Sequence, residues 1–174
     1  ASSLYANAEE GSFYGPSKQA AERYIEKFYK HFGLNYTILR FGSLYGSRSD
    51  NSNGIKSMIY SAVKNKKIVY TGSKRAKRKY IHVEDVAKTC VEIIKSKYKN
   101  KYLTITGKRT IKVKSLIDML AKHFKLSKRK IKYLNTKGHG HYDIEPTQFS
   151  PRIGKKLTIK KEKNFKKSVI NLVR

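Results

Sequence analysis

The chain has little of several residue types, and each shortage excludes something. It contains one cysteine, three prolines and no tryptophan in 174 residues. The single cysteine, Cys90, cannot form an internal disulfide, which is typical of proteins from a reducing cytoplasm. No apolar run approaches the roughly 20 residues needed to span a bilayer, and no basic and apolar leader opens the chain. We therefore expect a cytoplasmic, globular protein with no membrane partner.

Acidic residues are scarce as well. Asp and Glu number 12 against 40 Lys and Arg, which gives a formal net charge of +28. Residues 1–63 hold seven basic against five acidic residues, whereas residues 64–174 hold 33 against seven. Such a field attracts polyanions, including nucleic acid, but only nine of the cations are arginine, the residue that base recognition favours. We expect nonspecific contact with nucleic acid, and a basic polyanion-binding module stays open as an alternative function.

The order of apolar patterns predicts strands and helices that alternate along the chain. A helix is expected from Ser12, as its N-cap, to Gly33, as its C-terminal stop. Further helices are expected at 55–63, 84–98 and 113–125, and strands at 34–41, 67–72, 80–83, 102–107 and 130–134. Residues 42–54 are expected to form a loop, and the basic tail to be weakly helical from Asn164. This alternation is typical of an α/β fold with parallel strands.

The first predicted helix carries a tyrosine and a lysine one turn apart, Tyr14 and Lys18. The same spacing recurs in three other places, so by itself it proves nothing: Tyr60/Lys64, Tyr70/Lys74 and Tyr133/Lys137. Tyr14 and Lys18 also belong to a stripe that we expect to pack inward, together with Ala21, Ile25, Phe28 and Phe32. A lysine on an inward stripe needs a functional reason.

Proton transfer is the chemistry open to such a pair. A tyrosine ordinarily titrates at about pH 10 and is a weak base at neutral pH. Positive charge one helical turn away favours phenolate, and a phenolate can take the proton from a hydroxyl group. The alternative interpretation is a surface pair on a lysine-rich helix. We adopt that alternative for the other three pairs, because no strand ending in serine precedes them.

Four motifs in a fixed order give Tyr14 and Lys18 a context. A serine pair, Ser2-Ser3, precedes YGPSK (14–18), and LRFGSLYGSR (39–48) and RKYIHVEDVA (78–87) follow. This order resembles the extended short-chain dehydrogenase/reductase family, specifically its NAD-dependent nucleotide-sugar epimerases and dehydratases. Together the four motifs are far more specific than any one of them.

The resemblance implies a fold and a division into domains. It covers residues 1–97 in the correct order and residues 98–145 only as strand, helix and strand, while residues 141–157 are similar to the tails of some sugar epimerase-like proteins. It implies the C-terminal part of a doubly wound parallel-sheet (Rossmann-type) domain over residues 1–108. A small α/β substrate lobe with a basic tail would then occupy residues 109–174.

The resemblance also implies roles for the residues around the tyrosine. Tyr14 would be the catalytic acid–base, and Lys18 would hold the nicotinamide ribose of NAD or NADP. A serine at the preceding strand end would orient the substrate oxygen; Ser3 is our candidate, with Ser2 as the second choice. Phe41, at the start of the following loop, would contact the cofactor together with Tyr14 and Lys18.

Three further residues would handle the substrate. Ser43 occupies the position where relatives usually have an asparagine beside the cofactor and the sugar-nucleotide phosphate. Arg78 occupies the position where relatives often place an arginine on the substrate diphosphate, and Arg48 is a second candidate, since guanidinium groups bind phosphate oxygens in pairs. The alternative for Arg78 is that it is one more cation in the basic segment 73–79.

The implied function is an NAD(P)-dependent nucleotide-sugar epimerase, with dehydratase and reductase as related reactions. Dehydratases of the family usually carry acidic residues just before the tyrosine, whereas this chain has Ser12 and Phe13 there, which favours epimerase or reductase. No G-x-G-x-x-G turn occurs in the sequence, and the spacing from Ser3 to Tyr14 is shorter than usual. We therefore expect the C-terminal portion of a longer, homodimeric enzyme, with a non-catalytic remnant of the fold as the alternative.

The remaining candidates receive structural interpretations. His139 and His141 flank a glycine without a clear third and fourth ligand, so we expect a loop and no metal site. Cys90 lies on the apolar stripe of a predicted helix, where a nucleophile is not expected. His82 and Asp85 are expected to be structural, one on a short strand and one at a helix start.

Overall fold

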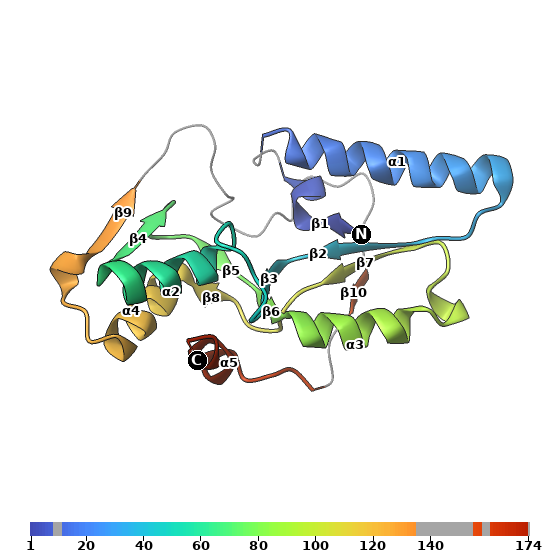
Figure 1. Cartoon of the computed structure of the whole chain (residues 1–174). Helices are drawn as coiled ribbons and strands as arrows, with labels where there is room; N and C mark the ends of the chain where they lie inside the picture. The colour runs from blue at the N-terminus through green and yellow to red at the C-terminus, as the bar shows by residue number, and fades with distance from the viewer. Residues whose placement is uncertain (9–11, 135–154, 158–160, 174) are drawn as a thin grey trace.

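Strands and helices alternate through the described part of the chain, as the sequence predicted (Figure 1). The computed structural model describes residues 1–8, 12–134, 155–157 and 161–173. Its four-stranded sheet is parallel, in the order β1-β2-β7-β10, and consists of β1 (Ser2–Ser3), β2 (Thr37–Phe41), β7 (Lys101–Ile105) and β10 (Lys155–Leu157). The register places Ser3 opposite Phe41, and Phe41 opposite Ile105. The predicted α/β fold with parallel strands is confirmed.

Helices cover both faces of this sheet (Figure 1). α1 (Tyr14–Phe32) runs along one face and α3 (Val83–Ile93) along the other. A short 3-10 helix, η1 (Leu4–Asn7), follows β1 directly and packs against α1. Because both faces are covered, the open space is left at the carboxyl ends of the strands, where ligands bind in folds of this kind.

One strand lies where the sequence predicted only a loop. β3 (Ser43–Tyr45) pairs in parallel with β6 (Tyr80–His82). The expectation of an uninterrupted loop over residues 42–54 was therefore wrong at its start. Three residues are too few to show the alternation of a strand, and their partner lies far away in the sequence.

Residues after β3 supply a further group of elements. Its helices are α2 (Gly54–Asn65) and α4 (Val113–His123), joined by α5 (Phe165–Asn171) near the C-terminus. β4 (Ile68–Thr71) pairs in parallel with β9 (Ile131–Leu134), and β5 (Lys77–Arg78) pairs antiparallel with β8 (Ile111–Lys112). Two 3-10 helices complete the described elements, η2 (Ser96–Tyr98) and η3 (Lys128–Lys130).

Two apolar clusters hold these elements together. The larger cluster lies between α2, β4, α4 and α5; its fully buried members include Ile55, Ile68, Leu116, Ile117, Leu120 and Val169. The smaller cluster lies between the sheet and α3; its buried members are Ile81, Val86, Ile93, Leu103 and Ile105. The larger cluster draws buried residues from both sides of residue 108, and the division into domains at that point stays a prediction.

The ends of α1 agree only in part with the sequence. Gly33 ends the helix in the left-handed conformation, with φ of 68°, and its N–H donates to Tyr29 O, as expected of a C-terminal glycine. Ser12 is not the N-cap. It has φ of 52° and lies two residues before the first helical residue, Tyr14. The hydroxyl of Ser17, in the first turn, donates a hydrogen bond to Tyr14 O.

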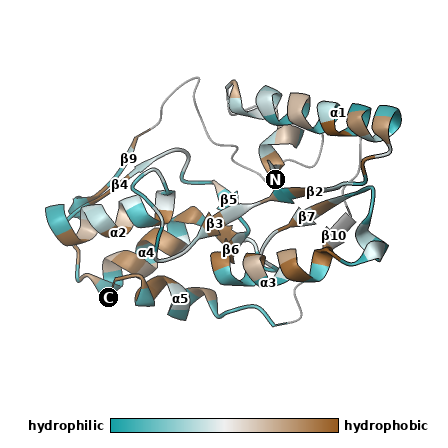
Figure 2. Cartoon of the chain, turned by 45° about the vertical axis from the view of Figure 1, so that its right-hand side comes forward, coloured by the Kyte–Doolittle hydropathy of each residue, from teal (hydrophilic) through white to brown (hydrophobic). Residues whose placement is uncertain are grey.

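The inward face of α1 is polar, which contradicts the sequence-based expectation. Phe28 and Phe32 are 49% and 76% exposed, whereas Glu22 and Glu26 are buried. Hydrophobic residues, drawn in brown, therefore lie on the outer side of this helix as well (Figure 2). Periodicity identifies an apolar stripe but not the direction it faces, and here the strands below α1 offer charged and polar partners to the acidic residues.

Among the residues that the structure describes, no helix is both long enough and apolar enough to cross a bilayer.

Candidate active site

A cavity of about 850 Å³ opens at the carboxyl ends of β1 and β2. The cavity is lined by every residue that the sequence analysis proposed for catalysis, cofactor binding or substrate binding. These residues are Ser3, Tyr14, Lys18, Phe41, Ser43, Arg48 and Arg78, and Ser2 lines the cavity as well. These residues come from α1, from the ends of four strands and from one loop. The fold therefore brings together residues that are up to 76 positions apart, from Ser2 to Arg78.

The tyrosine and lysine of α1 form one wall of the cavity. Tyr14 is the first residue of α1 and is 49% exposed. The Lys18 Nζ atom lies 5.3 Å from the centroid of the Tyr14 ring. Tyr5 of η1 meets the same ring edge-on, at 5.7 Å between centroids, and also lines the cavity. The pair thus presents a phenol and an ammonium group to the same open space.

The two serines of β1 have different partners. Ser2 Oγ donates a 2.5 Å hydrogen bond to the buried carboxylate of Glu22. Ser3 Oγ accepts a 3.3 Å hydrogen bond from Tyr5 N and so caps η1. Accepting this bond uses a lone pair and leaves the Ser3 hydroxyl proton for another acceptor. The geometry therefore favours Ser3 over Ser2 as the hydroxyl that faces a substrate.

A single residue, Gly42, separates Phe41 from Ser43 beside the cavity. Phe41 ends β2 and is half-buried against the smaller apolar cluster, and Ser43 begins β3. A Cβ atom at Gly42, between them, would lie 2.7 Å from Thr106 Cγ2. Only glycine permits this close approach of the two chain segments. Gly42 thereby lets Phe41 and Ser43 line the same cavity.

The two candidate arginines differ in how firmly they are held. Arg78 ends β5, is 6% exposed, and its Nη1 donates to Lys77 O at 2.9 Å. Arg48 is exposed in the loop that precedes α2. Both line the cavity. Arg78 therefore resembles a fixed binding group, whereas Arg48 belongs to the accessible rim.

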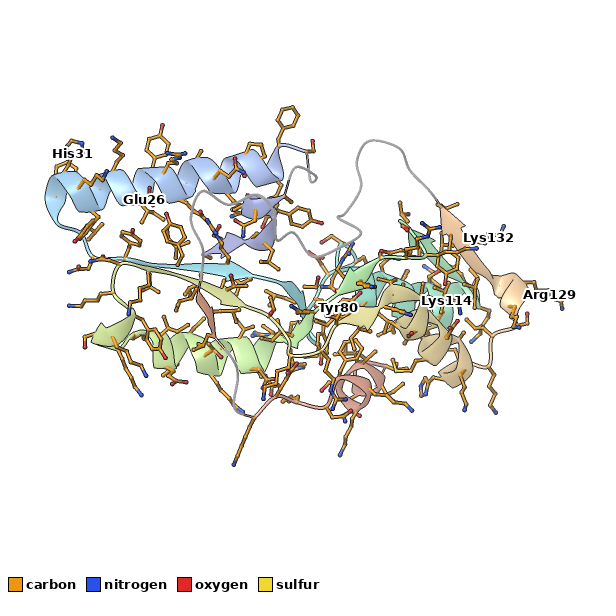
Figure 3. The ribbon with its side chains drawn as sticks, turned by 180° about the vertical axis from the view of Figure 1, so that it is seen from behind. Glu26, His31, Tyr80, Lys114, Arg129 and Lys132 are labelled. Atoms are coloured by element: carbon orange, nitrogen blue, oxygen red, sulfur yellow. The ribbon has the colours of Figure 1, made fainter. Side chains whose placement is uncertain are left out.

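Sequence reasoning missed part of the cavity wall. Tyr70 of β4 and Tyr80 of β6 line it, and so does the loop from Asp50 to Asn53. Tyr80 stacks on Phe165 of α5 at 5.2 Å between centroids, which places it near the middle of the molecule (Figure 3). Asn53 caps α2 by accepting from Ile55 N and Lys56 N. Aromatic residues on predicted strands were a signal, but the wall they share is set by tertiary contacts.

The residues for which we predicted a structural role make contacts that support the fold. His82 Nδ1 accepts from Glu84 N and so caps α3, and the fully buried Asp85 accepts from Lys163 N at 3.0 Å. Burial raises the pKa of the half-buried Cys90 thiol. Tyr60 lies outside the cavity wall and receives a 2.9 Å hydrogen bond from Lys64.

The two histidines of the tail, His139 and His141, lie outside the residues that the structure describes. Within the described ranges, no group of three or more His, Cys, Asp or Glu side chains could hold a metal ion.

The fold and the cavity together define the class of protein. A parallel sheet with helices on both faces and a polar cavity at its carboxyl ends is a doubly wound α/β structure of the nucleotide-binding type. The sequence model of the NAD dependent epimerase/dehydratase family matches residues 2–106. The chain belongs to this family, which confirms the resemblance to extended short-chain dehydrogenase/reductases.

Curated relatives are similar over part of their length. A protein of Methanocaldococcus jannaschii assigned as a UDP-glucose 4-epimerase is 33% identical over 111 residues, 62% of this chain and 35% of that protein. The dTDP-D-glucose 4,6-dehydratase of Dictyostelium discoideum is 30% identical over 73 residues, 42% of this chain and 17% of that protein. The chain therefore covers a minor part of each of these relatives.

Solved structures share the fold at lower sequence identity. The dTDP-glucose 4,6-dehydratase of Bacillus anthracis, solved with NAD, has a TM-score of 0.79 at 17% identity, over 99% of this chain and 58% of that one. The UDP-glucuronic acid 4-epimerase of Bacillus cereus, solved with UDP-glucuronic acid and NAD, has a TM-score of 0.77 at 18% identity, with the same coverage. Both likenesses show the Rossmann-type fold.

The side chains of the cavity suit one end of the family's cofactor. Tyr14 and Lys18 offer a hydroxyl and an ammonium group as donors, which suits the hydroxyls of a ribose. Phe41 adds an aromatic surface beside them. These residues fit the nicotinamide-ribose end of NAD, whereas the sequence has no glycine-rich turn of the kind that binds the pyrophosphate.

Proposed function

We propose that this chain carries the acid–base and substrate-binding residues of an NAD(P)-dependent nucleotide-sugar epimerase, with a dehydratase or reductase as the related alternatives. One observation carries the proposal: Ser3, Tyr14, Lys18, Phe41, Ser43, Arg48 and Arg78 line a single cavity. Membership of the NAD dependent epimerase/dehydratase family supports the reaction class. NAD, when bound, supplies the acceptor and donor of hydride.

Proton transfer falls to three side chains. The Tyr14 phenolate takes the proton from a sugar hydroxyl and, as the phenol, returns it, while the Ser3 hydroxyl donates a hydrogen bond to the same sugar oxygen. Lys18, whose ammonium lies 5.3 Å from the Tyr14 ring centroid, places positive charge where negative charge develops. The same ammonium would hold the nicotinamide ribose. Each role needs only a short reach into the cavity that these residues line.

Binding of the nucleotide diphosphate falls to three other side chains that line the cavity. Arg78 is buried and would hold phosphate oxygens in a fixed geometry, since a guanidinium group donates two parallel hydrogen bonds. Arg48 on the rim would add a second contact. Ser43 would contribute a hydroxyl between the phosphate and the cofactor, in the position where relatives usually have an asparagine.

Replacing Tyr14 with phenylalanine tests the proposal. Tyr14→Phe removes the hydroxyl and keeps the ring, so in the intact gene product we expect kcat to fall about 100-fold or more while cofactor affinity stays nearly unchanged. Tyr60→Phe is the matched control, because Tyr60 also precedes a lysine by one turn but lies outside the cavity. Turnover is measured with UDP- and dTDP-hexoses. Undiminished turnover in Tyr14→Phe would remove Tyr14 from the mechanism.

A non-catalytic remnant of the fold is the alternative, and cofactor titration distinguishes it. Saturable binding of NADH, followed by nicotinamide fluorescence, supports the enzyme. Absence of binding by the intact gene product would favour the remnant.

The compartment and assembly proposed for the enzyme follow from two further observations. A single cysteine and the lack of a membrane-spanning helix among the described residues agree with a cytoplasmic location. The exposed aromatic residues of α1 support a homodimer, as many relatives in this family form.

A further inference from the structure

Beneath α1 lies a buried polar network that joins the helix to two strands. Arg40 of β2 donates from Nε to Glu22 Oε1 at 2.9 Å and from Nη2 to Glu22 Oε2 at 2.6 Å. Ser2 of β1 donates to the same Glu22 Oε1 at 2.5 Å. The side chains of Arg40 and Glu22 are only 3% and 7% exposed. We call these three residues the Ser2–Glu22–Arg40 network.

A second pair continues the network toward β7. Tyr102 donates a hydrogen bond to Glu26, one helical turn after Glu22, and its ring lies 4.8 Å from the Arg40 guanidinium. Figure 3 shows Glu26 on the side of α1 that faces the strands. Burial raises the pKa of Tyr102 to about 12, so its hydroxyl stays a donor throughout the neutral range. Two acidic side chains of one helix are thus bound to three neighbouring strands, β1, β2 and β7.

Stability alone is a weak explanation for this network. Burying two charges is costly, and apolar residues of similar volume often leave a protein equally stable or more stable. Phe28 and Phe32 are available on α1 for apolar packing, yet they lie outside, exposed. What the paired charges do provide is geometry, because a bidentate arginine–carboxylate contact permits only one arrangement. The rotation and position of α1 are therefore set by polar contacts.

Each member of the network lies next to a residue of the candidate active site. Ser2 precedes Ser3, Arg40 precedes Phe41, and the register pairs Ser2 with Arg40 and Ser3 with Phe41. Glu22 lies one helical turn after Lys18, which itself lies one turn after Tyr14. A shift of α1 along β1 would therefore change the distance from Tyr14 and Lys18 to Ser3 directly.

We propose that Glu22, bound by Ser2 and Arg40, is a positioning residue that fixes the register of α1 against β1 and β2, and with it the geometry of Tyr14, Lys18 and Ser3. This inference rests on the proposed function, since it assigns the register a catalytic purpose. It predicts that the network acts on the rate of proton transfer rather than on substrate affinity.

The decisive variant replaces the ion pair with apolar residues, Glu22→Leu with Arg40→Met. We expect this double variant to fold, because the charges are removed together. We expect kcat to fall about 100-fold from a displacement of the order of 1 Å, with KM changed less than about threefold. The control is Lys114→Ala with Asp118→Ala, an exposed ion pair within α4, which should leave kcat unchanged. A folded double variant with full kcat would overturn the proposal.

Arg40→Lys is the second variant, should the double variant fail to fold. It keeps the charge but loses the two-pronged contact, so kcat should fall while KM holds. An unchanged kcat in folded Arg40→Lys would also overturn the proposal.

Hydrogen exchange separates this inference from the proposed function. In the double variant, amides of α1 should exchange at least about tenfold faster, while those of α3 keep their rates. This readout needs no turnover, so it stands even if Tyr14→Phe shows that Tyr14 is not catalytic. Unchanged exchange in α1 would mean that the network does not set the register.

Discussion

At the scale of single residues, His82 shows how the N-terminus of α3 depends on protonation. Its Nδ1 accepts a hydrogen bond from Glu84 N, which caps α3 and requires a neutral ring. Burial lowers the pKa of His82 below its usual 6.5, and the nearby Lys163 lowers it further, while Glu84 and Asp85 oppose the shift. The ring also packs edge-on against Tyr45, 5.1 Å away.

The pH dependence of stability follows from this shift. Because the unfolded chain binds a proton at His82 at higher pH than the folded chain does, stability is fully present above pH 6.5 and is lost as the pH falls through the folded pKa. His82→Asn keeps a side-chain oxygen that can cap α3, so we expect the free energy of unfolding to change by no more than about 1 kcal/mol. The variant has no imidazole to titrate at this position. Urea unfolding between pH 7 and pH 5 should show a smaller loss in the variant. Parallel profiles for the two proteins would contradict this account.

At the scale of elements, α1 presents an apolar surface to solvent. Phe13, Tyr24, Phe28 and Phe32 are all exposed on this helix, while its inner face holds the acidic residues of the Ser2–Glu22–Arg40 network. Contiguous exposed aromatic residues mark contact surfaces more often than free ones. The helix therefore has two different faces, a polar one toward the strands and one with exposed aromatic residues toward solvent.

Charged substitutions on this surface test the proposed homodimer. Phe28→Glu with Phe32→Glu should convert a dimer into a monomer, because like charges would face each other across an interface related by two-fold symmetry. The control is Val91→Glu, at an equally exposed apolar position on α3. Mass is measured by light scattering after size exclusion. Dimers that persist in the double variant would place the interface elsewhere, and monomers in the wild type would refute the homodimer.

At the scale of the whole molecule, the charge is unevenly distributed. Lys114, Arg129 and Lys132 lie at the same end, around α4, η3 and β9 (Figure 3), and all three are exposed. The cavity with Tyr14 lies at the carboxyl ends of β1 and β2 instead. The basic surface thus extends well beyond the site that would bind a nucleotide diphosphate.

Salt dependence tests whether this charge has a specific purpose. We expect the protein to bind duplex DNA weakly, with affinity falling at least about 100-fold between roughly 50 and 200 mM salt. Two unrelated sequences should bind equally, and heparin should compete fully. Fluorescence anisotropy measures the affinity for each DNA and the competition by heparin. A sequence preference that survives about 200 mM salt would support a dedicated nucleic-acid function.

Particular residues show which parts of the fold and of the cavity wall the sequence could predict. Motif order predicted that Ser3, Tyr14 and Arg78 belong together, and the cavity wall contains all three; their roles stay predictions. The strand at Ser43–Tyr45 was missed because three residues show no period. Tyr70 and Tyr80 were missed as wall residues because their neighbours are distant in sequence.

The sequence by itself determined the order of the longer helices and strands, the stop at Gly33 and the set of polar residues around Tyr14, because these follow from local periodicity, glycine conformation and motif order. Only the tertiary structure decided which side of α1 faces the strands. An apolar stripe would normally pack inward, but the burial of Glu22 and Glu26 depends on partners from β1, β2 and β7. Such a balance between ion pairing and apolar burial is set by contacts between distant segments, which no local pattern contains.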